Sequence, residues 1–449
     1  MKPEYASLFK GRGPPGPTSP DRKVLDLNTN HLMSYYLIIT GLVFLAAIFG
    51  YINVRFFKLP TTIGLMVVTI FYTLGVWGLS YFDDTLLKAE AEFIHQIDFE
   101  TVLMDYMLSF LLFAGALHTN FKELKKLRWP IIAFATLGVV SSTFLIGTAT
   151  FYLLQLLGME VNYTYCLLFG AVISPTDPIA VLGILKKAKA PKKLELKIVG
   201  ESLFNDGIGV VLFLTLYKIA SSTGSTIDPV DILKLFGQEV IGGILLGLFI
   251  GWVTYRLLKS INDFSTEVII TLAAVMVGTV IAGELHLSAP LAMVMAGLLV
   301  GDDRVRNASM SETTELYVDK FWELIDILLN AILFVLLGME MLVLTYEINY
   351  ILAGLIAIPI VLLCRYTSLW LPVKMFEKKL DFVPHTTAIM AWGGLRGGIS
   401  IALALSLSEE MNREMFLVMT YIVVVFSILV QGLTIEKVIK RLLPGNGEG

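Results

Sequence analysis

The sequence is poor in charged residues and in cysteine. Of its 449 residues only 16% are charged, whereas a soluble domain carries roughly 25%, so the chain cannot form a fully charged, water-facing surface. The net charge of −4 gives no positive field for nucleic acid. The only two cysteines, Cys166 and Cys364, lie in apolar segments and define no disulfide framework. Soluble, nucleic-acid-binding and disulfide-rich secreted classes are therefore excluded.

Long apolar segments fill most of the chain instead. Hydrophobic residues make up 56% of it, and the mean hydropathy is +0.75. Since a membrane-spanning helix needs about 20 apolar residues, we expect an all-α polytopic membrane protein with about 13 transmembrane helices. The predicted spans are 34–54, 60–81, 99–119, 130–157, 163–185, 198–220, 232–255, 266–285, 287–300, 323–345, 350–373, 385–408 and 414–434.

The loops between these spans alternate between acidic and basic. Basic loops follow the odd-numbered spans, and the acidic loops are even-numbered, so the positive-inside rule predicts a cytoplasmic C-terminus and an outside N-terminus. The basic N-terminal tail would by itself predict an inside N-terminus. The alternation of charge extends over many more loops, so we base the orientation on it. The most basic loop, after the fifth span, contains Lys186, Lys187, Lys189, Lys192, Lys193 and Lys197.

Two short tails flank a single membrane domain over residues 33–440. Residues 1–32 are rich in Gly and Pro near their middle and are predicted to be disordered, and 441–449 form a short cytoplasmic tail. No apolar core of a signal peptide precedes residue 32. The segment 302–320 mixes both signs of charge, so we expect an interfacial helix there on the cytoplasmic side.

Three polar clusters lie at membrane depth, where charged groups are costly and usually mark ion or substrate pathways. The first, Ser174 to Pro178, contains Pro175 and Pro178 on either side of Thr176 and Asp177. Because each proline removes a backbone donor, the fifth helix should break here and free carbonyl groups beside a carboxylate. At membrane depth, non-helical backbone is tolerated only where it is buried inside the protein or lines a water-filled cavity. A structural proline kink is the alternative interpretation.

The second cluster lies early in the sixth helix. Ser202, Asn205 and Asp206 are spaced three and four residues apart, which puts them on one helical face. Glu201 precedes Ser202. Polar side chains can also join helices by hydrogen bonds alone. That alternative does not account for the two carboxylates, Glu201 and Asp206, which indicate a site that water can reach.

The third cluster, Gly393 to Gly398, interrupts the twelfth helix with Gly393, Gly394, Gly397 and Gly398 around Arg396. Close helix packing through small residues is the alternative to a break. The interrupted fifth and twelfth helices are seven apart, as inverted repeats of six helices would require. Paired broken helices are typical of secondary transporters with inverted repeats, with the seventh helix as the connector.

Two further polar positions remain open. Arg365 lies well inside the eleventh helix and stays charged, so it needs a carboxylate partner, for which Glu201 is the natural candidate, unless it snorkels to an interface. Asp326 and Asn330, four apart in the tenth helix, form a polar seam with either a functional or a packing role.

Taken together and in order, Thr176-Asp177-Pro178, Glu201 to Gly207 and Gly393 to Gly398 resemble the cation/proton antiporter family one, which includes bacterial NhaP and animal NHE exchangers. The resemblance covers residues 33–440. It implies an NhaA-like fold with crossing broken helices 5 and 12, a homodimer, and elevator-like movement. Helices 1–3 and 8–10 would form the scaffold, and helices 4–6 and 11–13 the ion-transport core.

The resemblance also assigns roles to residues. It implies that Asp206 and Asp177 hold the transported Na⁺, with Ser202 and the Thr176 backbone nearby. It implies a structural ion pair between Glu201 and Arg365. Asn205, where electrogenic relatives carry a second aspartate, implies electroneutral exchange.

The chemistry of the residues is consistent with this expectation. Sodium prefers hard oxygen ligands, and carboxylates, hydroxyls and carbonyls are all offered here. A buried aspartate beside another carboxylate retains a proton more readily than one in water, so H⁺ and Na⁺ can compete for Asp206. Together with this chemistry, the resemblance implies electroneutral exchange of Na⁺ or Li⁺ for H⁺ across a bacterial or archaeal inner membrane, serving pH and sodium homeostasis without a cofactor. Exchange of K⁺ is the main alternative; a cation channel and an intramembrane aspartyl protease are weaker ones.

Overall fold

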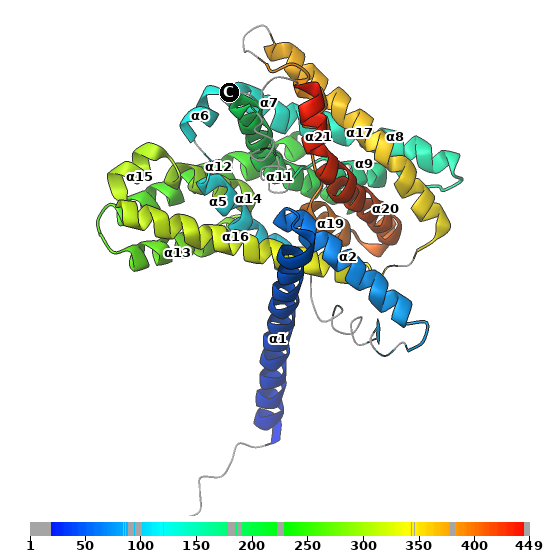
Figure 1. The fold of residues 1–449 in the computed structure, drawn as a ribbon, viewed down its shortest axis with the longest axis horizontal. Coiled ribbons are helices and arrows are strands. Elements are labelled where there is room, and N and C mark those ends of the chain that lie inside the picture. Colours follow the sequence, from blue (N-terminus) through cyan, green and yellow to red (C-terminus); the bar gives the residue numbers. More distant parts are fainter. Residues whose placement is uncertain are drawn as a thin grey trace, which may run out of the picture.

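The protein is a bundle of α-helices of very unequal length (Figure 1). The structure, a computed structural model, describes residues 19–83, 85, 87–88, 94, 101–119, 121–177, 185, 191–221, 229–342, 344, 346–377 and 382–443. Within these residues the chain is helical apart from short connections. This agrees with the predicted all-α architecture.

The described helices are named here in their order along the chain. Those of the first half are α1 (Ser19–Ile52), α2 (Thr61–Leu79), α5 (Leu108–Leu117), α6 (Phe121–Lys126), α7 (Arg128–Ala133), α8 (Val139–Leu156), α9 (Tyr163–Ile173) and α11 (Lys192–Ser221). Those of the second half are α12 (Pro229–Leu258), α13 (Phe264–Glu284), α14 (Ala289–Val300), α15 (Asp303–Ser309), α16 (Glu312–Glu340), α17 (Ile348–Phe376), α18 (Thr386–Trp392), α19 (Gly398–Leu405), α20 (Arg413–Phe426) and α21 (Gly432–Leu442).

Helix length and composition support a polytopic membrane protein. The described part of the chain contains nine helices long and apolar enough to span a bilayer, and shorter apolar helices at Val102–Leu117, Tyr163–Ile173 and Ala289–Val300. The interrupted pair α18 and α19 occupies the predicted twelfth span. The total of thirteen stays a prediction, because the second half of the fifth span lies outside the described residues.

Two boundaries differ from those predicted. Helix α1 already begins at Ser19, well before residue 32, since the Gly- and Pro-rich part of the tail ends there and Pro20 is tolerated in a first turn. The prediction of one interfacial helix over 302–320 is wrong. The segment contains the short helix α15 and then the first turns of α16. Ser311 caps the start of α16, and its side chain accepts a hydrogen bond from the Thr314 amide. The long helix α16 thus begins with polar turns and continues into a stretch that is apolar enough to span a bilayer.

The helices pack in two groups that meet along α11, α14, α16 and α19. In one group α5, α12, α13, α14 and α16 surround a core that includes Trp322, and α1 and α2 pack on α16. In the other group α8 packs on α9 and α17, while α20 packs on α17 and α19. The two interrupted segments, after α9 and between α18 and α19, both belong to this second group.

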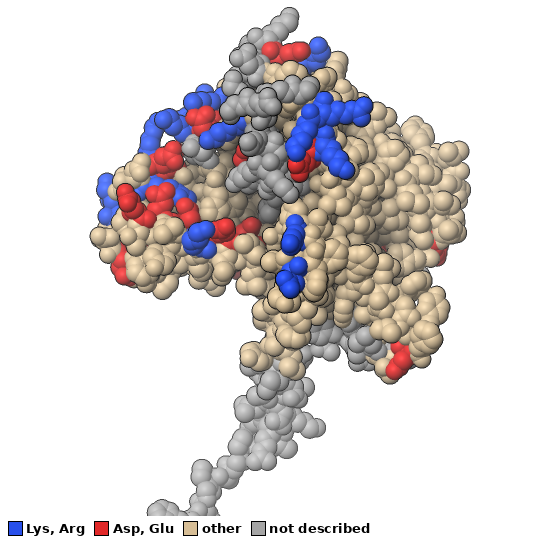
Figure 2. Space-filling model, viewed as in Figure 1, with Lys and Arg blue, Asp and Glu red and all other residues tan. Residues whose placement is uncertain are grey.

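Much of the face seen in Figure 2 is without charge, as a lipid-facing surface should be. Figure 2 shows broad areas without charged side chains, while Lys, Arg, Asp and Glu gather near α6, α15 and α21. Large apolar side chains such as Phe249 and Trp252 are more than half exposed. Exposed apolar area on this scale exceeds what a soluble monomer presents.

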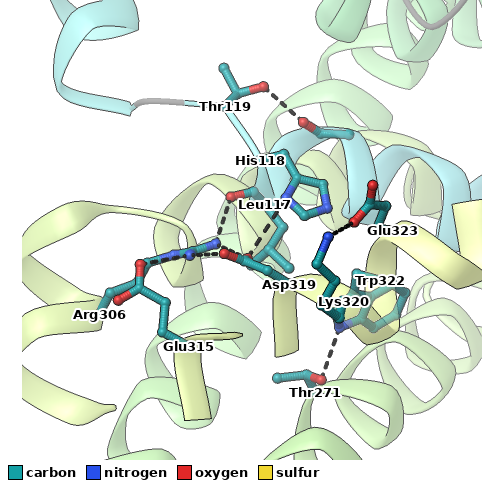
Figure 3. A network of polar contacts seen from close by, with 11 residues as sticks. Leu117, His118, Thr119, Thr271, Arg306, Glu315, Asp319, Lys320, Trp322 and Glu323 are labelled. Carbon is teal, nitrogen blue, oxygen red and sulfur yellow. Dashed lines mark hydrogen bonds and ion pairs between the residues drawn. The ribbon is translucent and has the colours of Figure 1, made fainter. Parts of the chain in front are cut away.

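A polar network ties α15 and α16 to the end of α5 (Figure 3). The Arg306 guanidinium donates to Asp319 at 2.8 and 2.9 Å, to Glu315 at 3.0 Å and to the carbonyl oxygen of Leu117 at 3.0 Å. His118 Nδ1 lies 3.7 Å from Asp319. Burial works to lower the pKa of Arg306, but its bonds to Asp319 and Glu315 outweigh this and raise the pKa overall. Arg306 therefore stays charged, and its two carboxylate partners compensate that charge at this end of the bundle.

Candidate functional site

The chain leaves helical geometry at the first polar cluster. Helix α9 ends at Ile173, and Ser174 to Asp177 have no regular structure. Pro175 cannot donate a backbone hydrogen bond and so cannot continue the helix. Ser174 Oγ donates to the Gly170 carbonyl at 2.7 Å and accepts from Thr143 Oγ1 at 3.1 Å, which closes the last turn of α9. Pro178 lies outside the described residues.

A second interruption, between α18 and α19, faces the first. Residues 393–397 separate the two short helices. The backbone amide of Asp177 donates to the Leu395 carbonyl at 2.8 Å, and Arg396 Nη1 donates to the carbonyls of Ser174 and Pro175 at 2.6 and 2.7 Å. The break in one helix thus leaves carbonyl groups that the break in the other helix satisfies, as membrane depth requires.

Two polar side chains of α11 hold the Thr176 segment from the other side. Ser202 Oγ donates to the Thr176 carbonyl oxygen. Asn205 Nδ2 donates to Thr176 Oγ1 at 2.8 Å, and the Thr176 amide donates to Asn205 Oδ1 at 3.3 Å. Thr176, Ser202 and Asn205 are each at most 3% exposed. The structure therefore brings the first two polar clusters into direct contact.

Glu201 and Arg365 form a buried ion pair beside this contact. Arg365 Nη2 lies 2.5 Å from Glu201 Oε1, and both side chains are almost fully buried. Asn205 Nδ2 also donates to Glu201 Oε1 at 3.4 Å. Among the described residues, Arg365 Nε and Nη1 have no hydrogen-bond partner. Arg365 thus depends on Glu201 for the compensation of its charge.

Asp206 and Asp177 line one small cavity. Its volume is about 40 Å³, room for about one water molecule or small ion. The wall also includes Pro175, Asn330 and Ser400, and Leu108, Leu111, Leu112, Gly115, Leu203, Leu333, Gly397, Gly398 and Ile399 complete it. Asp206 is 3% exposed. The cavity therefore presents two carboxylates within otherwise mostly apolar walls.

Two glycines of the third cluster allow close approach to these groups. A Cβ atom on Gly397 would lie 2.5 Å from Asp177 Oδ2, and one on Gly394 would lie 3.0 Å from Arg365 Nε. Any side chain at Gly397 would displace the Asp177 carboxylate. The glycines that weaken this helix therefore also make room for Asp177 and Arg365.

Sequence reasoning missed several residues of this region. Arg396 was predicted only as part of a helix break, and the structure places its guanidinium on the carbonyls of the other break. Ser427 Oγ accepts from the Arg396 amide at 2.9 Å, and Ser400 lines the cavity. Serine in an apolar helix is too common to single these residues out. Asn330 did give a signal, its spacing of four from Asp326.

Comparison with known proteins agrees with this geometry. The family profile described as "Sodium/hydrogen exchanger, transmembrane" matches residues 43–441. The chain is 45% identical over 414 residues to the Na⁺/H⁺ antiporter NhaP of Pseudomonas aeruginosa, covering 91% of this chain and 97% of that protein. It is 32% identical over 392 residues to the Na⁺/H⁺ antiporter NhaH of Halobacillus dabanensis, covering 86% and 93%.

A solved structure is also similar in fold. The sodium proton antiporter MjNhaP1 from Methanocaldococcus jannaschii superposes with a TM-score of 0.70 at 18% sequence identity, covering 93% of this chain and 99% of that one. At this identity the likeness concerns the fold alone. The family profile and the relatives, however, span nearly the whole membrane domain, and the chain therefore belongs to the sodium/hydrogen exchanger family.

Proposed function

We propose that the protein exchanges Na⁺, or Li⁺, for H⁺ across the membrane, with the two ions competing for Asp206. Proteins of its family are secondary transporters, not enzymes, and they use the transported ions without a cofactor. The channel and protease interpretations of the sequence do not fit this family. The relatives from Pseudomonas aeruginosa and Halobacillus dabanensis are named as Na⁺/H⁺ antiporters.

The single observation that carries the proposal is the cavity shared by Asp206 and Asp177. Both residues supply carboxylate oxygens, the hard ligands that Na⁺ prefers. Asp206 is buried, so its ionised carboxylate, with neither a proton nor a cation bound, has a high free energy away from water. Binding either a proton or a sodium ion relieves that cost. We also assign to the site the Thr176 backbone and Ser202, whose hydroxyl donates to the Thr176 carbonyl beside the cavity wall.

Alternating access would follow from movement of one helix group against the other. We assign α8, α9, α11, α17, α18, α19 and α20 to the moving core, and α1, α2, α5, α13, α14 and α16 to a scaffold that dimerises. In support, helices pack mainly within each of these groups, and α12 packs chiefly on α13 and α14. The proposed orientation places the N-terminus outside and the C-terminus in the cytoplasm, in the plasma or inner membrane.

The test is cation-driven proton flux in proteoliposomes that contain the purified protein, with Na⁺, Li⁺ and K⁺ supplied separately. Na⁺ or Li⁺ should drive proton movement in the wild-type protein. Asp206→Asn keeps the shape of the side chain but removes its charge, so it should abolish exchange while the protein still folds. Near-wild-type exchange by Asp206→Asn would place the site elsewhere, and flux driven by K⁺ alone would favour the K⁺/H⁺ alternative.

A further inference from the structure

Asp326 is a third carboxylate near the ion cavity, and it belongs to a different helix group from Asp177 and Asp206. It lies midway along α16, about 21 Å from the start of that helix at 1.5 Å per residue. Its side chain is only partly exposed. Neither the helix break nor the α11 cluster accounts for an acid at this depth.

Asn330 connects Asp326 to the cavity. Asn330 is 5% exposed and forms part of the cavity wall with Asp177 and Asp206. Its Nδ2 donates to Asp326 Oδ1 at 3.0 Å and to the Asp326 carbonyl at 2.9 Å. Asp326 therefore stands directly behind the wall of the proposed sodium site.

A polar stripe leads from the surface to this position. Asp319, Glu323, Asp326 and Asn330 are spaced four, three and four residues apart, which places them on one face of α16. The side chain of Glu323 is 53% exposed and pairs with Lys320, and Asp319 pairs with Arg306. Within the described part of the chain no basic side chain is bonded to Asp326. It is thus the innermost acid of the stripe, and its bonded partner is the neutral amide of Asn330.

We propose that Asp326 receives the cation as it passes between the Asp177 and Asp206 cavity and the side of the membrane from which α16 starts. That side is cytoplasmic in the orientation proposed above. The inference rests on the proposed exchange function. Asp326 stands on the scaffold group whereas Asp177 and Asp206 stand on the core group, so movement of the core brings them together in only one state. Asp326 therefore takes part in cation exchange with one side of the membrane and not with the other.

The experiment compares Km for Na⁺ in membrane vesicles of the two orientations. Asp326→Asn preserves the shape and an oxygen that accepts from Asn330, but removes the charge. We expect it to raise Km on the α16-start side by about tenfold, with no change on the opposite side and little change in maximal rate. Asp326→Glu retains the charge and should stay near the wild-type Km. Glu323→Gln, which neutralises an exposed acid one turn away, is the matched control and should have little effect.

The outcomes separate this inference from the proposed function. Wild-type vesicles that show no Na⁺-driven proton flux would refute the exchange function itself. If the wild type exchanges, an unchanged Km in Asp326→Asn would overturn the role of Asp326. An equal rise on both sides would also overturn it, because Asp326 would then belong to the shared site. Should Asp326→Asn fail to reach the membrane, Asp326→Ser supplies the same comparison.

Discussion

The backbone amide of Asp177 donates a 2.8 Å hydrogen bond to the carbonyl oxygen of Leu395, two residues that are 218 positions apart in the sequence. This bond joins the two interrupted segments at their centres. It also fixes the backbone of one cavity carboxylate against the partner segment. The position of the Asp177 side chain thus depends on both interruptions being intact.

Arg396 should be essential to this arrangement. Its guanidinium is buried and occupies the carbonyls of Ser174 and Pro175, so Arg396→Met would leave polar groups unsatisfied at a cost of about 1–3 kcal/mol each. We expect a lower melting temperature in detergent and a strong loss of exchange. The matched control is Arg413→Met, which removes a partly exposed arginine paired with Glu409 at the surface and should change neither. A fully stable, active Arg396→Met would show that the carbonyls find other donors.

Gly397→Ala should specifically disturb Asp177. The new Cβ would lie 2.5 Å from Asp177 Oδ2 and 2.8 Å from its Cβ, so the carboxylate has to move. Gly115→Ala is the control in the same cavity, because its Cβ would meet only Leu203 Cδ1, at 3.8 Å. We expect the Gly397 variant to show a raised Km for Na⁺ and the Gly115 variant to resemble the wild type. Equal behaviour of the two would contradict a role for this close approach.

Much of this fold could be predicted because the bilayer limits the choice of structure. Apolar segments of sufficient length give helices, and Pro175 beside Asp177 at membrane depth is hard to explain except by a break. The need of Arg365 for a carboxylate also follows from residue type alone. Such inferences use strong, local energetic penalties, which a single sequence displays.

Contacts between distant segments could not be predicted in the same way. Nothing local indicates that Arg396 bonds to Ser174 and Pro175 rather than to a carboxylate, because this depends on how the two interruptions cross. The extent of α16 was missed for a different reason. Its first turns are polar, and only the cap by Ser311 shows that they continue into the membrane helix.

The stoichiometry should be one Na⁺ for one H⁺. Asn205 carries no charge and is engaged with Thr176, so of the adjacent positions 205 and 206 on α11 only Asp206 supplies a carboxylate. Transport should therefore move no net charge. The measurement is the steady-state Na⁺ gradient in proteoliposomes with a potassium potential imposed by valinomycin. A gradient that changes with the imposed voltage would contradict this prediction.

Glu201 should hold Arg365 and not carry the transported ion. The two side chains are buried and lie 2.5 Å apart, and removal of one partner of a buried pair costs about 3–5 kcal/mol because the other charge is left uncompensated. Glu201→Ala and Arg365→Ala should each lower the melting temperature. The double variant should lose less stability than the sum of the two, because neither charge is then left alone.

An exposed pair on the same protein provides the control for this cycle. Arg413 and Glu409 lie 3.3 Å apart at the surface, where an ion pair contributes only about 0–1 kcal/mol, so the corresponding Ala variants should be nearly additive. Additive losses at Glu201 and Arg365 would instead show that the buried pair does not couple. Glu201→Gln separates the two roles further. A Gln variant that stays fully stable but no longer binds Na⁺ would assign Glu201 to the ion site, whereas lost stability with retained Na⁺ binding supports the structural pair.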